Sequence, residues 1–92
     1  PFASDGLLMT RDVTVLLFAR LRELAGTDRL NLALPIASNV RELRRCVSRQ
    51  VPEASGLIAR CAVAIEGEYV GDDAAIPDRA EIAFIPPVSG GS

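Results

Sequence analysis

Residues 81–92 read Glu-Ile-Ala-Phe-Ile-Pro-Pro-Val-Ser-Gly-Gly-Ser, an apolar segment followed by two prolines and a pair of glycines. The segment 82–85 is apolar throughout, which is typical of a strand covered on both faces. Pro86 and Pro87 have no backbone N–H group to donate, so they cannot continue a central strand. The pattern therefore predicts a chain that leaves its sheet directly after Ile85.

The residues beyond that strand have the composition of a slender arm. Polyproline geometry would direct its first part outward, namely Pro86, Pro87, Val88 and Ser89. Gly90 and Gly91 have no side chain, so this part could enter a channel in which any Cβ atom would clash. We therefore predict that residues 87–92 form a flexible tail that presents the end of the chain.

Four further strands are indicated by composition and alternation, at 13–18, 29–34, 61–65 and 69–70. The first is apolar on both faces, so it is either covered twice or meets a partner with its second face. The second has leucine at every other position, which predicts a half-buried strand that ends at Pro35.

Two helices are predicted between these strands. Residues 19–25, stopped by Gly26, indicate a helix of one or two turns. The main helix is expected to begin with Asn39 as its N-cap and Glu42 three residues later, with Ser38 as the alternative cap. Its buried stripe is expected to comprise Val40, Leu43, Val47 and Val51, and Pro52 is expected to end the helix.

The main helix also carries a cluster of arginines on its wetter faces, namely Arg41, Arg44, Arg45 and Arg49. Two interpretations are open. Charged side chains usually occupy the solvated face of an amphipathic helix, which is the simpler interpretation. The functional interpretation is a docking patch for an acidic partner.

The order of elements favours an α+β fold, with one main helix packed across one face of a mixed sheet. The first and last strands are expected side by side in its centre. This arrangement resembles the β-grasp of ubiquitin-like proteins, and we assign that domain to residues 11–86. Residues 1–10 are expected to be disordered or a vector-derived extension, and residues 87–92 are the tail.

Composition excludes several classes of function. The chain has 92 residues, 49% of them hydrophobic, and a formal net charge of −2, which argues against nucleic acid and anionic membranes as partners. No histidine is present, so a zinc site or a histidine-based triad is not expected. Cys46 and Cys61 are expected to be reduced and buried. No secretory signal is recognisable at the start, so we expect a cytoplasmic protein.

Two segments of the sequence resemble those of a known protein family. Residues 85–91, Ile-Pro-Pro-Val-Ser-Gly-Gly, closely resemble the end of the small subunits of molybdopterin synthase, which are ubiquitin-like sulfur carriers. Residues 18–26, Phe-Ala-Arg-Leu-Arg-Glu-Leu-Ala-Gly, resemble the phrase that follows the first strand in the same proteins. The resemblance implies a carrier in molybdenum cofactor biosynthesis that is not an enzyme on its own.

The resemblance also implies the chemistry and the partners. A ubiquitin-activating-like adenylating enzyme would use ATP to activate Gly91, a persulfide donor would convert Gly91 to a thiocarboxylate, and the tail would donate this sulfur inside the large synthase subunit. No cofactor or metal is expected on this chain itself. Phe18 and Ile85 are expected to contribute to an apolar docking surface for the partner, with ordinary core positions as the alternative.

Ser92 departs from the family pattern, because an amide bond to Ser92 leaves Gly91 without a carboxylate. A vector-derived residue, a precursor trimmed by a protease, and a tail that has lost its function are the three explanations. Other functions also fit a terminal Gly-Gly. They are a sulfur carrier for thiamine or tRNA thiolation, a ubiquitin-like protein modifier, and an interaction domain with an inert tail.

Overall fold

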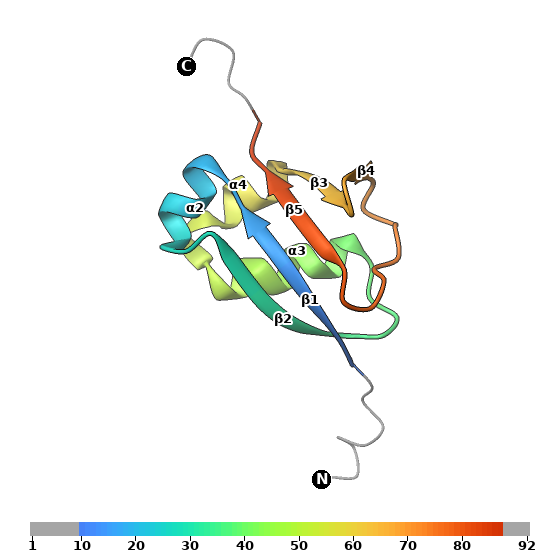
Figure 1. Ribbon diagram of the computed structural model, residues 1–92. Coiled ribbons are helices and arrows are strands. Elements are labelled where there is room, and N and C mark those ends of the chain that lie inside the picture. Colours follow the sequence, from blue (N-terminus) through green and yellow to red (C-terminus); the bar gives the residue numbers. More distant parts are fainter. Residues whose placement is uncertain (1–9, 88–92) are drawn as a thin grey trace, which may run out of the picture.

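Five strands form one mixed sheet in the order β2-β1-β5-β3-β4 (Figure 1). The computed structural model describes residues 10–87. The strands are β1 (Thr10–Leu17), β2 (Arg29–Pro35), β3 (Ala62–Ile65), β4 (Glu68–Val70) and β5 (Glu81–Ile85). β5 runs parallel to β1 and antiparallel to β3. The first and last strands are therefore neighbours, as the sequence predicts, and the sheet is mixed.

The first strand begins earlier and ends earlier than the segment 13–18. It already includes Thr10, which lies inside the stretch expected to be an extension, and it stops at Leu17. Phe18 is the N-cap of the next helix, α2 (Ala19–Ala25), because its carbonyl accepts the backbone N–H group of Leu21 at 3.1 Å. The prediction that Phe18 belongs to the strand is therefore wrong, whereas the short helix after it is confirmed.

The main helix is α3 (Val40–Gln50), and it lies across one face of the sheet (Figure 1). The Asn39 side chain accepts the Glu42 N–H group at 3.1 Å, which confirms Asn39 rather than Ser38 as the cap. The predicted stripe is confirmed as well, because Val40, Leu43 and Val47 are completely buried. They pack in one cluster with Ile82 and Phe84 of β5, so the central strand and the main helix together make the core.

Two short elements after α3 are missing from the sequence prediction. Pro52 does end α3, but it begins a 3-10 turn, η1 (Pro52–Ala54), which runs directly into α4 (Ser55–Arg60). Such short helices show too little periodicity to be recognised from the pattern alone. Both elements nevertheless contribute to the core, through Ala54 of η1 and Ile58 of α4.

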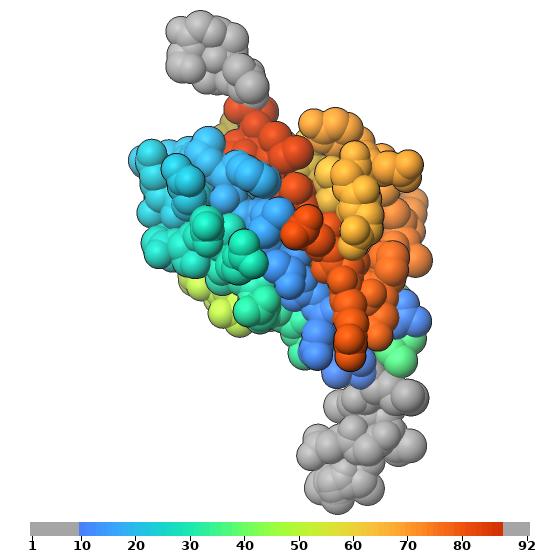
Figure 2. Space-filling model, viewed as in Figure 1, coloured from blue at the N-terminus to red at the C-terminus, as the bar shows by residue number. Residues whose placement is uncertain are grey.

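The opposite face of the sheet has no helix over it in the described part of the chain (Figure 1). Figure 2 views the molecule from this side. The second set of central-strand side chains is only half-buried there, namely Thr14, Leu16, Ala83 and Ile85. The expectation of strands covered on both faces by their own domain is therefore wrong. The apolar character of this face instead fits the other alternative, a strand that meets a partner.

Candidate functional site

The tail leaves the sheet at one end of the central strand. Ile85, the last residue of β5, is paired with Ala62 of β3. Pro86 is half-buried and Pro87 is exposed, and neither belongs to a strand, which confirms the predicted exit. Val88, Ser89, Gly90, Gly91 and Ser92 lie outside the described residues, so their predicted roles stay predictions.

The face of the sheet without helices carries a row of apolar side chains that crosses four strands. Leu16 of β1 lies opposite Ala83 of β5, Ala83 lies opposite Ala64 of β3, and Ala64 lies opposite Tyr69 of β4. We call these four residues, together with Ile85, the outer face. Tyr69 is 71% exposed although it is large and apolar over most of its surface. An exposed aromatic at the edge of such a row is typical of an interaction surface.

Phe18 and Ile85 lie beside each other at the tail end of the outer face. Leu17 is paired with Phe84, so Phe18 and Ile85 are the next residues along two adjacent chain segments. Phe18 is 44% exposed, which excludes the alternative that it is an ordinary core residue. Ile85 is half-buried. Their contact with a partner stays a prediction, but the position of both residues suits it.

Sequence reasoning did not single out the other members of the outer face. Leu16, Ala83 and Ala64 are placed there by strand pairing, which joins residues far apart in the chain. Tyr69 was recognised as part of a short strand, and its exposure follows from its position on the edge strand β4. The one feature of the sequence that indicates the outer face is the apolar character of both faces of the first and last strands.

A hollow of about 580 Å³ is lined by residues of β1 and β2 and by Arg79, which lies in the turn before β5. Thr14, Asn31, Asp12 and Arg79 contribute to its lining. The Thr14 hydroxyl donates to the Asn31 side-chain oxygen at 3.3 Å, and the Arg79 N–H group donates to the Asp12 carbonyl at 2.8 Å. The first contact joins β1 to β2, and the second joins β1 to the turn before β5, so both are structural and we assign the hollow no chemistry.

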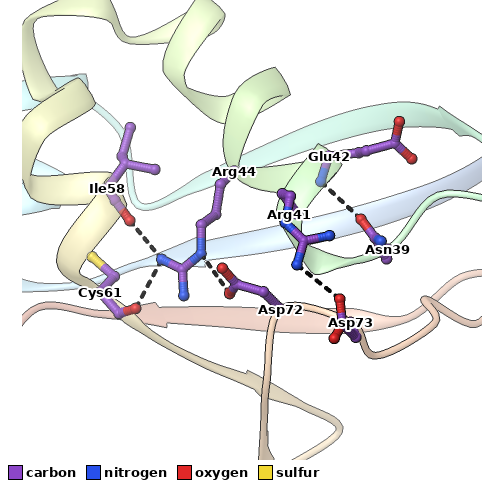
Figure 3. Close-up of polar contacts among 8 residues, drawn as sticks. All are labelled: Asn39, Arg41, Glu42, Arg44, Ile58, Cys61, Asp72 and Asp73. Atoms are coloured by element: carbon purple, nitrogen blue, oxygen red, sulfur yellow. Dashed lines mark hydrogen bonds and ion pairs between the residues drawn. The ribbon is translucent and has the colours of Figure 1, made fainter.

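A half-buried arginine, Arg44, links α3 to the end of α4 on the helical side of the sheet (Figure 3). Arg44 Nη1 donates to the carbonyl oxygens of Ile58 at 2.7 Å and Cys61 at 2.9 Å, and its Nε donates to Asp72 at 3.0 Å. Its guanidinium lies 6.0 Å from the centre of the Phe84 ring. The Arg44 side chain is only 18% exposed, so its predicted place on the wet face of the helix is wrong. The carbonyls at the end of α4 need donors, and Arg44 supplies them.

The other three arginines of α3 are exposed, as the sequence predicts. Arg41 donates to Asp73 at 2.8 Å, and Figure 3 shows both residues at the start of the helix. This hydrogen bond with Asp73, and the attraction between the two charges, hold the pKa of Arg41 above its ordinary value. Arg45 and Arg49 extend along the same helix.

Neither cysteine forms a disulfide, as expected. Cys61 is buried and belongs to the core, whereas Cys46 is only half-buried, so the predicted burial is confirmed fully for Cys61 alone. Burial raises the pKa of the Cys61 thiol, although the positive charges of Arg44 and Arg60 oppose this shift. A buried thiol held in its protonated form is a poor nucleophile.

Within residues 10–87, no group of three or more histidine, cysteine, aspartate and glutamate side chains could hold a metal ion. No helix in this part of the chain is long and apolar enough to cross a membrane.

Comparisons with known proteins agree with this geometry. The profile of the ThiS family matches residues 15–91. A molybdopterin synthase sulfur carrier subunit of Arabidopsis thaliana is 36% identical over 80 residues, which cover 87% of this chain and 83% of the relative. The match to the family thus reaches Gly91 and includes the whole of the predicted tail up to that residue.

Solved structures share the fold. A protein assigned as molybdopterin converting factor subunit 1 of Pyrococcus furiosus has a TM-score of 0.77 at 29% identity, over 85% of this chain and 99% of that one. The small archaeal modifier protein 1 of Methanosarcina acetivorans has a TM-score of 0.77 at 28% identity, over 90% and 99%. A ubiquitin of Caldiarchaeum subterraneum, at 15% identity and a TM-score of 0.62 over 90% and 100%, shows the fold alone. The predicted α+β, ubiquitin-like β-grasp fold is thereby confirmed.

Proposed function

This chain belongs to the ThiS family, and from that membership we propose that it is the sulfur carrier subunit of a molybdopterin synthase. The name of the Arabidopsis relative supports this pathway over other sulfur carriers. One structural observation carries the proposal. The central strand β5 is held between β1 and β3 and is followed directly by Pro86-Pro87, beside the exposed Phe18 and the half-buried Ile85, which is a geometry suited to presenting a chain end to a partner.

The chemistry of the tail would begin with a carboxylate on Gly91, which is a poor electrophile. An adenylating partner enzyme would let this carboxylate attack the α-phosphorus of ATP, so that pyrophosphate leaves and an acyl adenylate forms. A persulfide sulfur would then attack the carbonyl carbon and expel AMP, and a thiol would cleave the remaining S–S bond to leave a thiocarboxylate. Activation of this kind divides one difficult step into easier ones.

The large synthase subunit would receive both the tail and the outer face. Phe18 and Ile85 would dock against apolar residues of that partner, next to the point where Pro86 leaves the sheet. Gly90 would keep the tail narrow, and the segment from Pro86 to Ser89 would give it reach. The partner would supply the charged groups that stabilise the reacting sulfur and oxygen.

Ser92 has to be absent from the active carrier, because its amide bond occupies the Gly91 carbonyl. The family profile matches only as far as Gly91, which agrees with a functional end at that residue. We therefore infer that the working form of this protein ends at Gly91.

Intact mass spectrometry tests this proposal. A chain ending at Gly91 is incubated with an adenylating enzyme of this family, ATP and a persulfide donor, beside the chain that keeps Ser92 as the matched control. The expected result is a mass gain of one sulfur in exchange for one oxygen, located on Gly91, in the shorter chain only. If the shorter chain is never adenylated, the sulfur carrier function is wrong.

A second candidate function is a protein modifier, which the similarity to the Methanosarcina small archaeal modifier favours. Such a protein would attach its terminal glycine to lysine side chains of other proteins. All ten cationic residues of this chain are arginine, so it offers no lysine acceptor of its own. Isopeptide-linked remnants of Gly91 on cellular proteins, identified by mass spectrometry, would support the modifier function.

A further inference from the structure

Three arginines form a straight row on α3. Arg41, Arg45 and Arg49 are spaced four residues apart, so their side chains project from one side of the helix. Like charges at this spacing repel each other and destabilise an isolated helix. We call these residues the arginine row. A row of this kind is unfavourable for the free protein unless negative charges compensate it.

The chain compensates only one end of the row. Arg41 is paired with Asp73, but the Asp73 side chain is 88% exposed, so this pair is screened by water and can exchange partners. Within the described residues, no carboxylate lies within ion-pair distance of Arg45 or Arg49. Among residues 10–87, the one hydrogen bond of the Arg49 side chain is a donation to the Cys46 sulfur at 3.4 Å. Two guanidinium groups therefore keep most of their donors available.

The arginine row lines a groove of about 490 Å³ between α3 and α4. Arg44, Ser48, Ala59 and Asp72 complete the lining. The Asp72 carboxylate is already paired with Arg44, whose guanidinium also donates to the carbonyls of Ile58 and Cys61. The groove is thus lined mainly by arginines, and its one carboxylate is already neutralised by Arg44. Its volume is in the range of sites that bind small ligands or a few residues of a peptide.

The groove suits carboxylate side chains better than a compact phosphate. Phosphate sites usually use backbone N–H groups at a helix N-terminus. Here successive members of the arginine row are four residues apart on α3, about 6 Å along the helix axis, so their charges are spread over a length that an extended acidic segment spans better than one compact phosphate. The donors are therefore separate guanidinium groups, which pair with carboxylates in a bidentate way.

We propose that this groove docks an acidic segment of a protein partner, with carboxylates on Arg45 and Arg49. The groove lies on the helical side of the sheet, whereas the outer face lies on the other side (Figure 1). An acidic segment can therefore be held while the outer face and the tail are engaged elsewhere. The proposal depends on charge complementarity alone and does not rest on the sulfur carrier function.

Binding of a glutamate-rich octapeptide to the full chain tests the proposal. The peptide is titrated into the ¹⁵N-labelled protein at low salt, beside an octapeptide in which every glutamate is replaced by glutamine. Amide signals of residues 41–49 and of Ala59 are expected to shift with the acidic peptide only. Affinity is expected to fall as salt is raised, because exposed charge pairs are screened within about 10 Å at 0.1 M.

Matched variants distinguish binding of the peptide in the groove from nonspecific attraction to the positive charge of the protein. Arg45→Gln/Arg49→Gln is expected to weaken peptide binding by roughly tenfold, since each exposed pair contributes up to about fivefold. Arg20→Gln/Arg22→Gln removes the same charge from α2 and is expected to leave binding within about twofold. Absence of binding, equal loss in both variants, or binding of the glutamine peptide would overturn the proposal. Pyrophosphate that binds the groove without competition from the acidic peptide would also overturn it and indicate a small-anion site.

Discussion

Arg44 shows how one side chain can join three parts of the fold. It links α3 to the end of α4 through two carbonyl oxygens and to the loop after β4 through Asp72. It also lies over the ring of Phe84, the largest completely buried side chain of the core. A charged group at this site is tolerated because its donors are satisfied and part of it remains accessible to water.

We predict that Arg44→Met destabilises the protein by about 2 kcal/mol, because the stem still packs but the Cys61 carbonyl and Asp72 lose Arg44 as a donor, and the Ile58 carbonyl keeps only the Cys61 N–H group at 3.3 Å. Urea unfolding followed by circular dichroism measures the change. Arg20→Met is the control, because Arg20 is 67% exposed in its pair with Glu23 and its loss is expected to cost less than about 0.5 kcal/mol. Equal effects of the two substitutions would show that the Arg44 contacts do not stabilise the fold.

The Cys61 thiol gives a prediction about alkaline pH. Burial raises its pKa in the folded chain above its ordinary value of 9.0, so the folded state keeps its proton to higher pH than the unfolded state. The free energy of unfolding should therefore fall as pH rises from about 8 to about 10. In Cys61→Ala this fall should be smaller, and in Cys46→Ala, which keeps Cys61, it should persist. Identical pH profiles of the wild type and Cys61→Ala would contradict the prediction.

At the scale of elements, α3 is defined by local signals at both ends and by its stripe. Asn39 caps the first turn, Pro52 prevents continuation beyond Val51, and the buried valines and leucine follow helical spacing. The helix therefore forms where the sequence predicts it. α4 lacks such signals, and its position depends on contacts with α3 and η1.

We predict that Asn39→Ala lowers the free energy of unfolding by about 1 kcal/mol, because the Glu42 N–H group loses its acceptor. Asn39→Asp keeps an acceptor at the same place and should remain within a few tenths of a kcal/mol. Urea unfolding of the three proteins at neutral pH provides the comparison. Equal losses for alanine and aspartate would mean that the side chain does not act as a cap.

At the scale of the whole molecule, the two sides of the sheet differ in whether helices cover them. One side is closed by α3 and α4, and the core lies beneath them. On the outer face Leu16, Ala83 and Ile85 are half-buried, Ala64 is buried and Tyr69 is exposed, and the chain leaves the sheet at Pro86 beside them. This asymmetry leaves one face of the sheet without a helical cover while the core lies on the other side.

We predict that Phe18→Ser/Ile85→Ser weakens binding to a large molybdopterin synthase subunit by about tenfold or more, because apolar contacts at the tail exit are lost. Isothermal titration calorimetry measures the affinity, and unfolding curves show that the variant is folded. Ile36→Ser is the control, since Ile36 is 37% exposed in the turn after β2, away from the outer face. If the double variant binds as tightly as this control, neither Phe18 nor Ile85 contributes to the docking surface.

The sequence by itself determined the features that follow local rules. Proline ends β5 and α3 because it lacks a donor, Asn39 caps because its side chain reaches the next turn, and the stripe of α3 is set by helical periodicity. The terminal phrase also indicated the family. Only the tertiary structure decided which faces remain uncovered and which carbonyls lack donors. Arg44 is largely withdrawn from water because it contacts residues 14, 17 and 28 positions further along the chain, and no local sequence pattern predicts contacts at such separations.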